Sequence, residues 1–214
     1  GARRDALPVV LTEADIPGAN ECSPSFGGDP ILANDRIEFH GQLVFAVVAH
    51  ARDQARHAAR RSRIEIARET PAISVDDGLI SGETVLPNYQ FLRGDPDKVI
   101  AASERQAAGS IRVGGQEHFY LEGQIAMAVP GEGGGMHIFS STQHPSEVQH
   151  LVANMLTVSQ AQVVTECRRM GGGFGGRESQ ASQWACLAAL GAHATGRCVK
   201  IRLDRDDDMI MTGK

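Results

Sequence analysis

The stretch GGGFGGRESQ at residues 171–180 holds the residues best suited to chemistry in this chain. A backbone with few side chains adopts positive φ values readily and approaches a bulky ligand closely, with its N–H groups directed at polar oxygens. A flexible linker is the alternative, but linkers rarely carry apolar anchors, and Met170 and Phe174 interrupt the glycines here. Strand-like and helix-like segments flank the run. The pattern therefore favours a loop that contacts a ligand.

Two nucleotide-binding motifs overlap this loop, and both match it poorly. Gly171, Gly173 and Gly176 satisfy G-x-G-x-x-G, but the preceding QVVTECRR carries charges that a buried parallel strand lacks. The acidic residue expected about 20 residues later is missing, because the first candidate is Asp204. Read as a P-loop, the stretch puts Glu178 where a hydroxyl should hold magnesium. A dinucleotide-binding oxidoreductase remains as a weak alternative.

The loop resembles the GGGFGGKET-type loop of xanthine dehydrogenases, in their molybdenum-binding subunit or domain. Further segments resemble that family in the same order, and these are DIPGAN at 15–20, HGQLVFAVVA at 40–49, GGQEHFYLE at 114–122, STQ at 141–143 and LDRDDDM at 203–209. The resemblance spans nearly the whole chain. It also implies that the chain is a fragment, since the family's subunit is several times longer.

The resemblance assigns roles to four residues. A glutamine just past a strand offers an amide donor and acceptor, although on sequence alone Gln143 is more simply a turn residue. By resemblance Gln143 hydrogen-bonds an oxo ligand of molybdenum, and the backbone of Phe174 and Gly175 contacts the cofactor. Gln143 and Phe174 would thus lie near the metal without coordinating it. Glu178 matches the purine-recognising glutamate, where aldehyde-oxidising relatives carry an apolar residue; otherwise it is an acid favoured at a helix N-terminus.

Other residues of the matching motifs receive weaker interpretations. Arg177 stands where the family has lysine, and its role is open, because a guanidinium bridges differently from an ammonium. Gln116 and Glu122 are expected to line the cofactor side. His118 lacks a second metal ligand at helical or hairpin spacing, so we interpret it as structural.

The implied reaction is oxidative hydroxylation of hypoxanthine and xanthine to urate at a molybdenum–molybdopterin cofactor. Electrons would leave through iron–sulfur clusters and FAD to NAD⁺, on a partner subunit or domain, in a hetero-oligomer. No catalytic residue is expected within this chain, since the family's general base lies beyond the position of Lys214. The chain alone should therefore be inactive. A non-catalytic relative and an aldehyde-oxidising molybdenum hydroxylase are the alternatives.

Length and composition predict a segment of a soluble, cytoplasmic protein. The formal net charge of −5 suggests neither a nucleic-acid partner nor an anionic membrane. No apolar run approaches the ~18 residues needed to span a bilayer, and GARRDALPVV lacks the apolar core of a signal peptide. Four cysteines without a C-x-x-C pair predict reduced, mostly buried thiols. The acidic run at 204–208 is interpreted as a solvated or salt-bridged turn.

The pattern of elements predicts an α+β fold. Residues 1–70 would form an α/β domain that resembles the family's hammerhead domain and lacks its beginning. Residues 71–110 would form a connector, and residues 111–214 the first part of the molybdopterin-binding domain. Strands are expected at 9–11, 43–49, 64–66, 119–129, 136–141, 162–168 and 199–203. Helices are expected at 51–63, 97–108, 146–156 with Ser146 as its cap, and 178–195 ending at Gly196.

Overall fold

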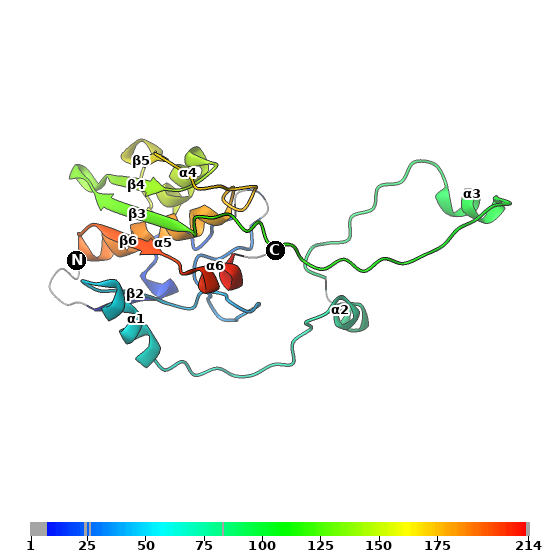
Figure 1. The fold of residues 1–214 in the computed structure, drawn as a ribbon, viewed down its shortest axis with the longest axis horizontal. Coiled ribbons are helices and arrows are strands. Elements are labelled where there is room, and N and C mark those ends of the chain that lie inside the picture. The colour runs from blue at the N-terminus through cyan, green and yellow to red at the C-terminus, as the bar shows by residue number, and fades with distance from the viewer. Residues whose placement is uncertain (1–7, 24, 26, 83, 213–214) are drawn as a thin grey trace. The chain divides into compact units, whose positions relative to one another are not determined.

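A computed structural model describes residues 8–23, 25, 27–82 and 84–212 of the chain (Figure 1). The chain divides by its internal contacts into a unit made of residues 1–62 and 115–214 and a second unit made of residues 63–114. The first seven residues, which include most of the segment examined for a signal peptide, lie outside the described part. The two units are described separately.

The first unit is built on a four-stranded mixed sheet of order β5-β4-β3-β6. Its strands are β3 (Ile125–Pro130), β4 (Met136–Ser140), β5 (Val163–Glu166) and β6 (Val199–Arg202). β3 and β4 form an antiparallel hairpin through the glycine-rich turn at 131–135, and β6 is antiparallel to the other edge of β3. Only β4 and β5 are parallel, as expected for strands joined by a helical crossover.

Two helices, α4 (Pro145–Leu156) and α5 (Gln180–Thr195), share the hydrophobic core with this sheet. Alternate residues of the central strands are buried, among them Ala128 and Ile138. Small residues let α5 approach its neighbours closely: a Cβ at Gly191 would lie 3.0 Å from Val48 and 3.1 Å from Val199. Most of α5 is buried, including Trp184 at 1% exposure. Burying side chains of this size contributes about 1.5–3 kcal/mol each.

The N-terminal strands pack into the same core. β1 (Val9–Leu11) pairs antiparallel with β2 (Ala46–Val48), and α1 (Arg52–Arg61) follows. The Asn20 side-chain amide donates to the Leu32 carbonyl at 2.8 Å and accepts from the Leu32 N–H at 3.1 Å, and Leu32 is completely buried. Gln183 of α5 donates to the Ile31 carbonyl at 3.1 Å, so this segment contacts α5.

The sequence predicted the end of α5 correctly and the start of α4 incorrectly. α5 ends at Gly196, whose φ of 66° is left-handed and suits glycine. The expected cap at Ser146 is wrong, since His144 is the N-cap and Pro145 occupies the first turn. A proline is favoured at the first helical position, where its missing N–H costs nothing. The helix consequently begins before Ser146.

The 63–114 unit contains α2 (Val75–Ser81) and α3 (Pro96–Ala102), neither of which buries a residue. The expected strand at Ile64 and Ile66 is wrong, because both residues lie outside regular structure with 47% and 59% of their surface exposed. A half-buried strand needs a neighbouring strand, and no pairing is found there among the described residues. We did not expect α2, and the helix expected at 97–108 ends at Ala102.

The α+β prediction is confirmed, and the sheet topology contradicts the dinucleotide-binding alternative. That alternative needs a parallel sheet with the glycines at its central switch point. Here the glycines follow β5, an edge strand of a mostly antiparallel sheet. Among the described residues no helix is both long and apolar enough to cross a bilayer.

The acidic run at 204–208 is not a solvated turn throughout. Its last residues enter α6 (Arg205–Met211), and Asp208 is only 1% exposed. Asp204 does form ion pairs, with Arg52 and Arg56 of α1. Of the four thiols, Cys22 and Cys186 are buried; Cys167 is half-buried and Cys198 exposed. Half of the thiols, rather than most of them, are therefore protected.

Candidate functional site

The glycine loop, residues 171–177, connects β5 to the start of α5 and turns sharply on itself. The Gly176 N–H donates to the Gly173 carbonyl at 2.7 Å. A Cβ at Gly173 would overlap the Gln143 carboxamide oxygen, and one at Gly176 would lie 2.5 Å from the Tyr120 ring. The glycines are therefore required by close approach to neighbouring side chains, which excludes the linker interpretation.

Gln143 is bound directly to this loop. Its Oε1 accepts from the Gly175 N–H at 3.0 Å and from the Arg177 N–H at 3.4 Å. The backbone N–H of Gln143 donates to the Arg177 carbonyl at 3.0 Å. Because both side-chain partners are donors, the amide oxygen must face the loop and the N–H₂ group must face away from it. The exposed Gln143 side chain thus presents a fixed neutral donor.

Phe174 stands at the tip of the loop in a strained conformation. Its φ is 53°, in the left-handed region that residues with a Cβ rarely adopt, and 77% of its surface is exposed. Strain of this kind costs on the order of 1–3 kcal/mol and is concentrated at functional sites. The N–H of the adjacent Gly175 already donates to Gln143 Oε1. The Gln143 N–H₂ group, in contrast, is directed away from the loop.

Glu178 directly follows Arg177, whose carbonyl accepts the Gln143 backbone N–H at 3.0 Å. It is exposed and stands just before α5, whose N-cap is Ser179, rather than within the helix. The pKa of His144 is raised mainly by its hydrogen bond to Glu147, and the negative charge of Glu178 adds to this rise. The structure therefore brings Gln143 together with the loop, although the two are distant in sequence.

Sequence reasoning missed the roles of Arg177 and Glu122. The Arg177 side chain is fully buried, and its guanidinium donates to the carbonyls of Ser141 at 3.1 Å, Gly123 at 2.9 Å and Glu122. It also lies 3.4 Å from the Glu122 carboxylate and 4.7 Å from the centre of the Tyr120 ring. Burial lowers the pKa of Arg177, and Glu122 opposes this effect.

A second polar cluster supports the end of the loop. Gln124 Nε2 donates to the Gly176 carbonyl at 2.8 Å and to the Tyr120 hydroxyl at 2.9 Å. The buried Asp208 accepts from the Tyr120 hydroxyl at 2.9 Å and from the Gln124 N–H at 3.1 Å. Burial raises the pKa of Tyr120, so the hydroxyl remains a donor. The run at 203–209 thus acts on the loop through Tyr120.

Two other residues of the GGQEHFYLE motif, His118 and Gln116, behave differently from Glu122. His118 packs against the loop, where a Cβ at Gly176 would lie 2.7 Å from its Nδ1. Both of its ring nitrogens are buried and lack a hydrogen-bond partner among the described residues. Gln116 is exposed. The interpretation of His118 as structural is consistent with its packing, although its polar atoms stay unsatisfied.

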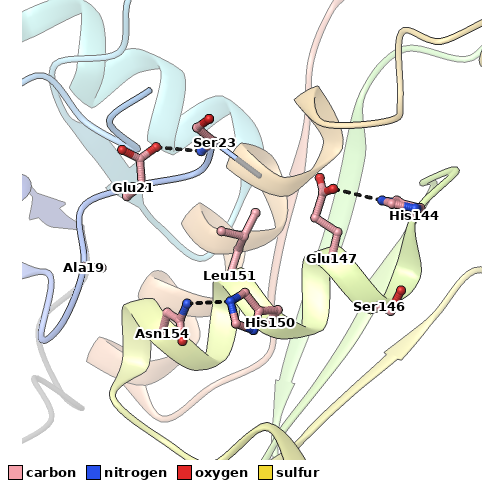
Figure 2. A pocket seen from close by; sticks show the side chains of 9 residues that line it. All are labelled: Ala19, Glu21, Ser23, His144, Ser146, Glu147, His150, Leu151 and Asn154. Carbon is pink, nitrogen blue, oxygen red and sulfur yellow. Dashed lines mark hydrogen bonds and ion pairs between the residues drawn. The ribbon is translucent and has the colours of Figure 1, made fainter. Parts of the chain in front are cut away.

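The cavity shown in Figure 2 lies elsewhere, between the loop at residues 19–23 and α4. Its volume is about 380 Å³, and Gln143, Phe174, Gly175 and Glu178 do not line it. The carboxylate of Glu21 in its wall accepts three backbone N–H groups, at 2.6, 2.7 and 3.1 Å. Because the Glu21 carboxylate is occupied by these backbone N–H groups, we interpret its role as stabilising the surrounding turn.

The residues around the glycine loop fit an oxygen-rich, bulky cofactor. Gln143 directs its amide N–H₂ group outward, and Phe174 is held in a strained position at the surface. An amide donor stabilises a metal-bound oxygen without competing for the metal. No cluster of three or more His, Cys, Asp or Glu side chains suited to a metal occurs in the described ranges. The described residues around the loop are therefore suited to contact a cofactor rather than to coordinate a metal through such a cluster.

Comparison with known proteins decides the family. The family model of the molybdopterin cofactor-binding domain matches residues 81–214. The chain belongs to this family. The model of the a/b hammerhead domain of aldehyde oxidase and xanthine dehydrogenase matches residues 3–70, before the molybdopterin-binding match.

Relatives of this chain include two proteins named xanthine dehydrogenase and one named xanthine dehydrogenase/oxidase. Identity is 41% over 196 residues with that of Drosophila pseudoobscura pseudoobscura, 38% over 208 residues with that of Dictyostelium discoideum, and 37% over 204 residues with the xanthine dehydrogenase/oxidase of Mus musculus. These alignments cover 91%, 97% and 95% of this chain and 15% of each relative. The chain therefore corresponds to a small part of those proteins.

Solved structures of two oxidoreductases share the fold. The aldehyde oxidoreductase of Desulfovibrio gigas superposes with a TM-score of 0.82 at 24% identity, over 96% of this chain and 25% of that one. The quinoline 2-oxidoreductase of Pseudomonas putida 86 gives a TM-score of 0.74 at 24% identity, over 94% and 28%. At this identity the likeness establishes the fold alone.

Proposed function

We propose that the chain forms one wall of the molybdenum-cofactor pocket of a xanthine dehydrogenase that converts hypoxanthine and xanthine to urate. The observation that carries the proposal is the pair of hydrogen bonds from Gly175 and Arg177 to Gln143 Oε1, at 3.0 and 3.4 Å. They leave the Gln143 N–H₂ group directed away from the loop. The relatives at 37–41% identity, all named xanthine dehydrogenases, support the same activity.

Each site residue has a defined task in this proposal. The Gln143 N–H₂ group donates to an oxygen of the cofactor, and the backbone of Phe174 and Gly175 borders it. Glu178 hydrogen-bonds the polar edge of the purine and so orients the carbon that is hydroxylated. When bound, the cofactor supplies the two-electron oxidation and the oxygen transfer. Arg177 and Glu122 hold the loop through hydrogen bonds and are given no direct contact with the cofactor in this proposal.

The rest of the enzyme is proposed by the same relationship. The chain spans about 15% of its relatives, so the general base, iron–sulfur clusters and FAD are assigned to parts outside it, with NAD⁺ as final acceptor and a hetero-oligomeric assembly. Free thiols suit a cytoplasmic enzyme. Domain limits at about residues 70 and 110 stay a prediction. Residues 1–70 would be the hammerhead-like domain, and 111–214 the start of the molybdopterin-binding domain.

Substitution of Glu178 tests the choice of substrate. In the full-length enzyme, Glu178→Val should reduce kcat/KM for xanthine far more than for an aromatic aldehyde, because the aldehyde has no polar edge to pair. The loss of one buried hydrogen bond corresponds to about 1–3 kcal/mol, or roughly tenfold to over a hundredfold in kcat/KM. Molybdenum content must be normalised. Glu132→Val, in the exposed hairpin turn, is the matched control.

The alternative outcomes are distinct. Equal losses on both substrates would remove Glu178 from the substrate site and leave it as a residue favoured near a helix N-terminus. Faster turnover of the aldehyde than of xanthine by the unmodified enzyme would favour an aldehyde-oxidising hydroxylase.

A further inference from the structure

Glu122 holds the beginning of the glycine loop. Its carboxylate accepts from the Gly171 N–H at 2.8 Å and from the Ser141 hydroxyl at 2.8 Å. Its backbone N–H donates to the Gly171 carbonyl at 3.2 Å. A Cβ at Gly171 would lie 2.6 Å from the Glu122 Cβ, so the two backbones are in direct contact. Gly171 is thus bonded on both of its polar backbone atoms to one residue.

Arg177 holds the other end of the loop. Its guanidinium donates to three backbone carbonyls. One belongs to Ser141, which follows β4, and the others belong to Glu122 and Gly123, which precede β3. Its backbone bonds Gln143 through both the N–H and the carbonyl. The position of the Gln143 amide is therefore set by the position of Arg177.

The two residues also meet each other, with Arg177 Nη1 3.4 Å from Glu122 Oε2. We propose that Glu122 and Arg177 form a clamp that closes the glycine loop and thereby positions the Gln143 donor for the cofactor. The assignment of the donor's target rests on the function proposed above; the clamp itself does not. Both are positioning residues, since the hydrogen bonds of their charged groups go to the loop and to the segments that adjoin it.

The number of donors makes the clamp testable with lysine. Arg177 makes its three carbonyl bonds with Nη1 and Nη2, while its Nε is buried without a partner among the described residues. A lysine ammonium carries three donors and a positive charge, which is what the three carbonyls and Glu122 require. Methionine is close to lysine in length and is also unbranched, but it has no hydrogen-bond donor. Arg177→Lys should therefore preserve the clamp and Arg177→Met should open it.

Amide hydrogen exchange in the full-length protein, produced without molybdenum, measures the clamp independently of the reaction. In Arg177→Met the amides of 171–176 should exchange about tenfold faster or more, as expected when several buried carbonyls lose their donor. Arg177→Lys should stay within about threefold of the unmodified protein by the same reasoning. Arg168→Met is the matched control, since Arg168 is 70% exposed and pairs with Glu166 beside β5. It should leave the loop unchanged.

A second readout separates positioning from simple stability. In enzyme produced with molybdenum, Arg177→Met should lower kcat per bound molybdenum and Arg177→Lys should restore it. Should Arg177→Met not fold, Glu122→Leu decides, because it removes the acceptor of the Gly171 N–H at a site that is 37% exposed. In Glu122→Leu the amides of 171–176 should also exchange faster than in the unmodified protein.

Unchanged loop exchange in a folded Arg177→Met protein, or in Glu122→Leu, would overturn the clamp. Normal kcat per molybdenum in Arg177→Met would overturn its positioning role. A protein that lacks molybdenum and purine turnover before any substitution would instead overturn the proposed function and leave the exchange result standing.

Discussion

The glycine loop and the 63–114 unit are both rich in turn-forming residues, yet they are stabilised in opposite ways. The loop takes its hydrogen bonds from residues distant in sequence, namely Glu122, Gln124 and Gln143. The 63–114 unit relies mostly on local caps, such as Ser74 with Asp77. Its large apolar side chains remain exposed, including Ile80 at 86%. Long-range polar contacts, rather than composition, therefore distinguish a rigid glycine segment from an open one.

Truncation of leucines should give the largest difference between the two units. Leu190 in α5 is fully buried, whereas Leu79 in α2 is 76% exposed. Leu190→Ala should lower the free energy of unfolding of the 214-residue chain by about 2–5 kcal/mol, because it leaves a cavity. Leu79→Ala should change it by no more than about 0.5 kcal/mol. Urea unfolding measures both, and comparable losses would mean that α2 is packed in solution.

Alanine substitution of glycines should give a smaller contrast. A Cβ at Gly176 meets the Tyr120 ring, which three hydrogen bonds prevent from moving, whereas a Cβ at Gly109 meets nothing within 4 Å. Gly176→Ala should destabilise the chain by about 1–3 kcal/mol through overpacking. Gly109→Ala should remain within about 0.5 kcal/mol of the unmodified chain. A neutral Gly176→Ala in the same unfolding assay would show that the loop yields easily.

Acid titration should give the smallest effect. The pKa of Glu166 is held below its usual 4.5 by its bond from Arg168, with His137 adding to this, and the pKa of Asp77 is lowered by Ser74. Because both pKa values are depressed by folding, the stabilisation is present above the unfolded-state values and is lost as pH falls through the folded-state values. Both carboxylates are solvent-accessible, so salt screens the effect.

The measurement is the thermal midpoint between about pH 6 and pH 3. Glu166→Gln should be less stable than the unmodified chain at the upper end, and the two should converge at the lower end. Asp77→Asn should leave the midpoint unchanged throughout, since Asp77 caps only α2. A gap for Glu166→Gln that widens with acid would contradict the assigned ion pair.

Local signals predicted much of the fold. The hairpin-like turn at 130–135 located β4 and the end of β3, although β3 begins at Ile125 and the strand expected from residue 119 is wrong over 119–124. Gly196 located the end of α5, because a helix end depends on neighbouring residues. The same signals failed at Ile64 and Ile66, since a strand exists only with a partner. They also missed α2, whose two acidic residues and glycine look like a turn but lie behind a capping serine.

The candidate site was less accessible to sequence reasoning. Gln143 alone looks like a turn residue, and its place beside the loop followed from resemblance and not from spacing. The contact of Arg177 with Glu122 joins residues 55 positions apart in the chain, so no local pattern could reveal it. A cation immediately after a glycine run was the one available signal, because a buried charge needs a partner.

Metal analysis of the full-length protein, combined with purine turnover, tests the central claim most directly. The account predicts stoichiometric molybdenum and oxidation of xanthine to urate, and it predicts that Gly173→Ala reduces both, since the new Cβ would displace the Gln143 carboxamide. A purified, folded, full-length protein that contains no molybdenum and oxidises neither hypoxanthine nor xanthine would contradict it.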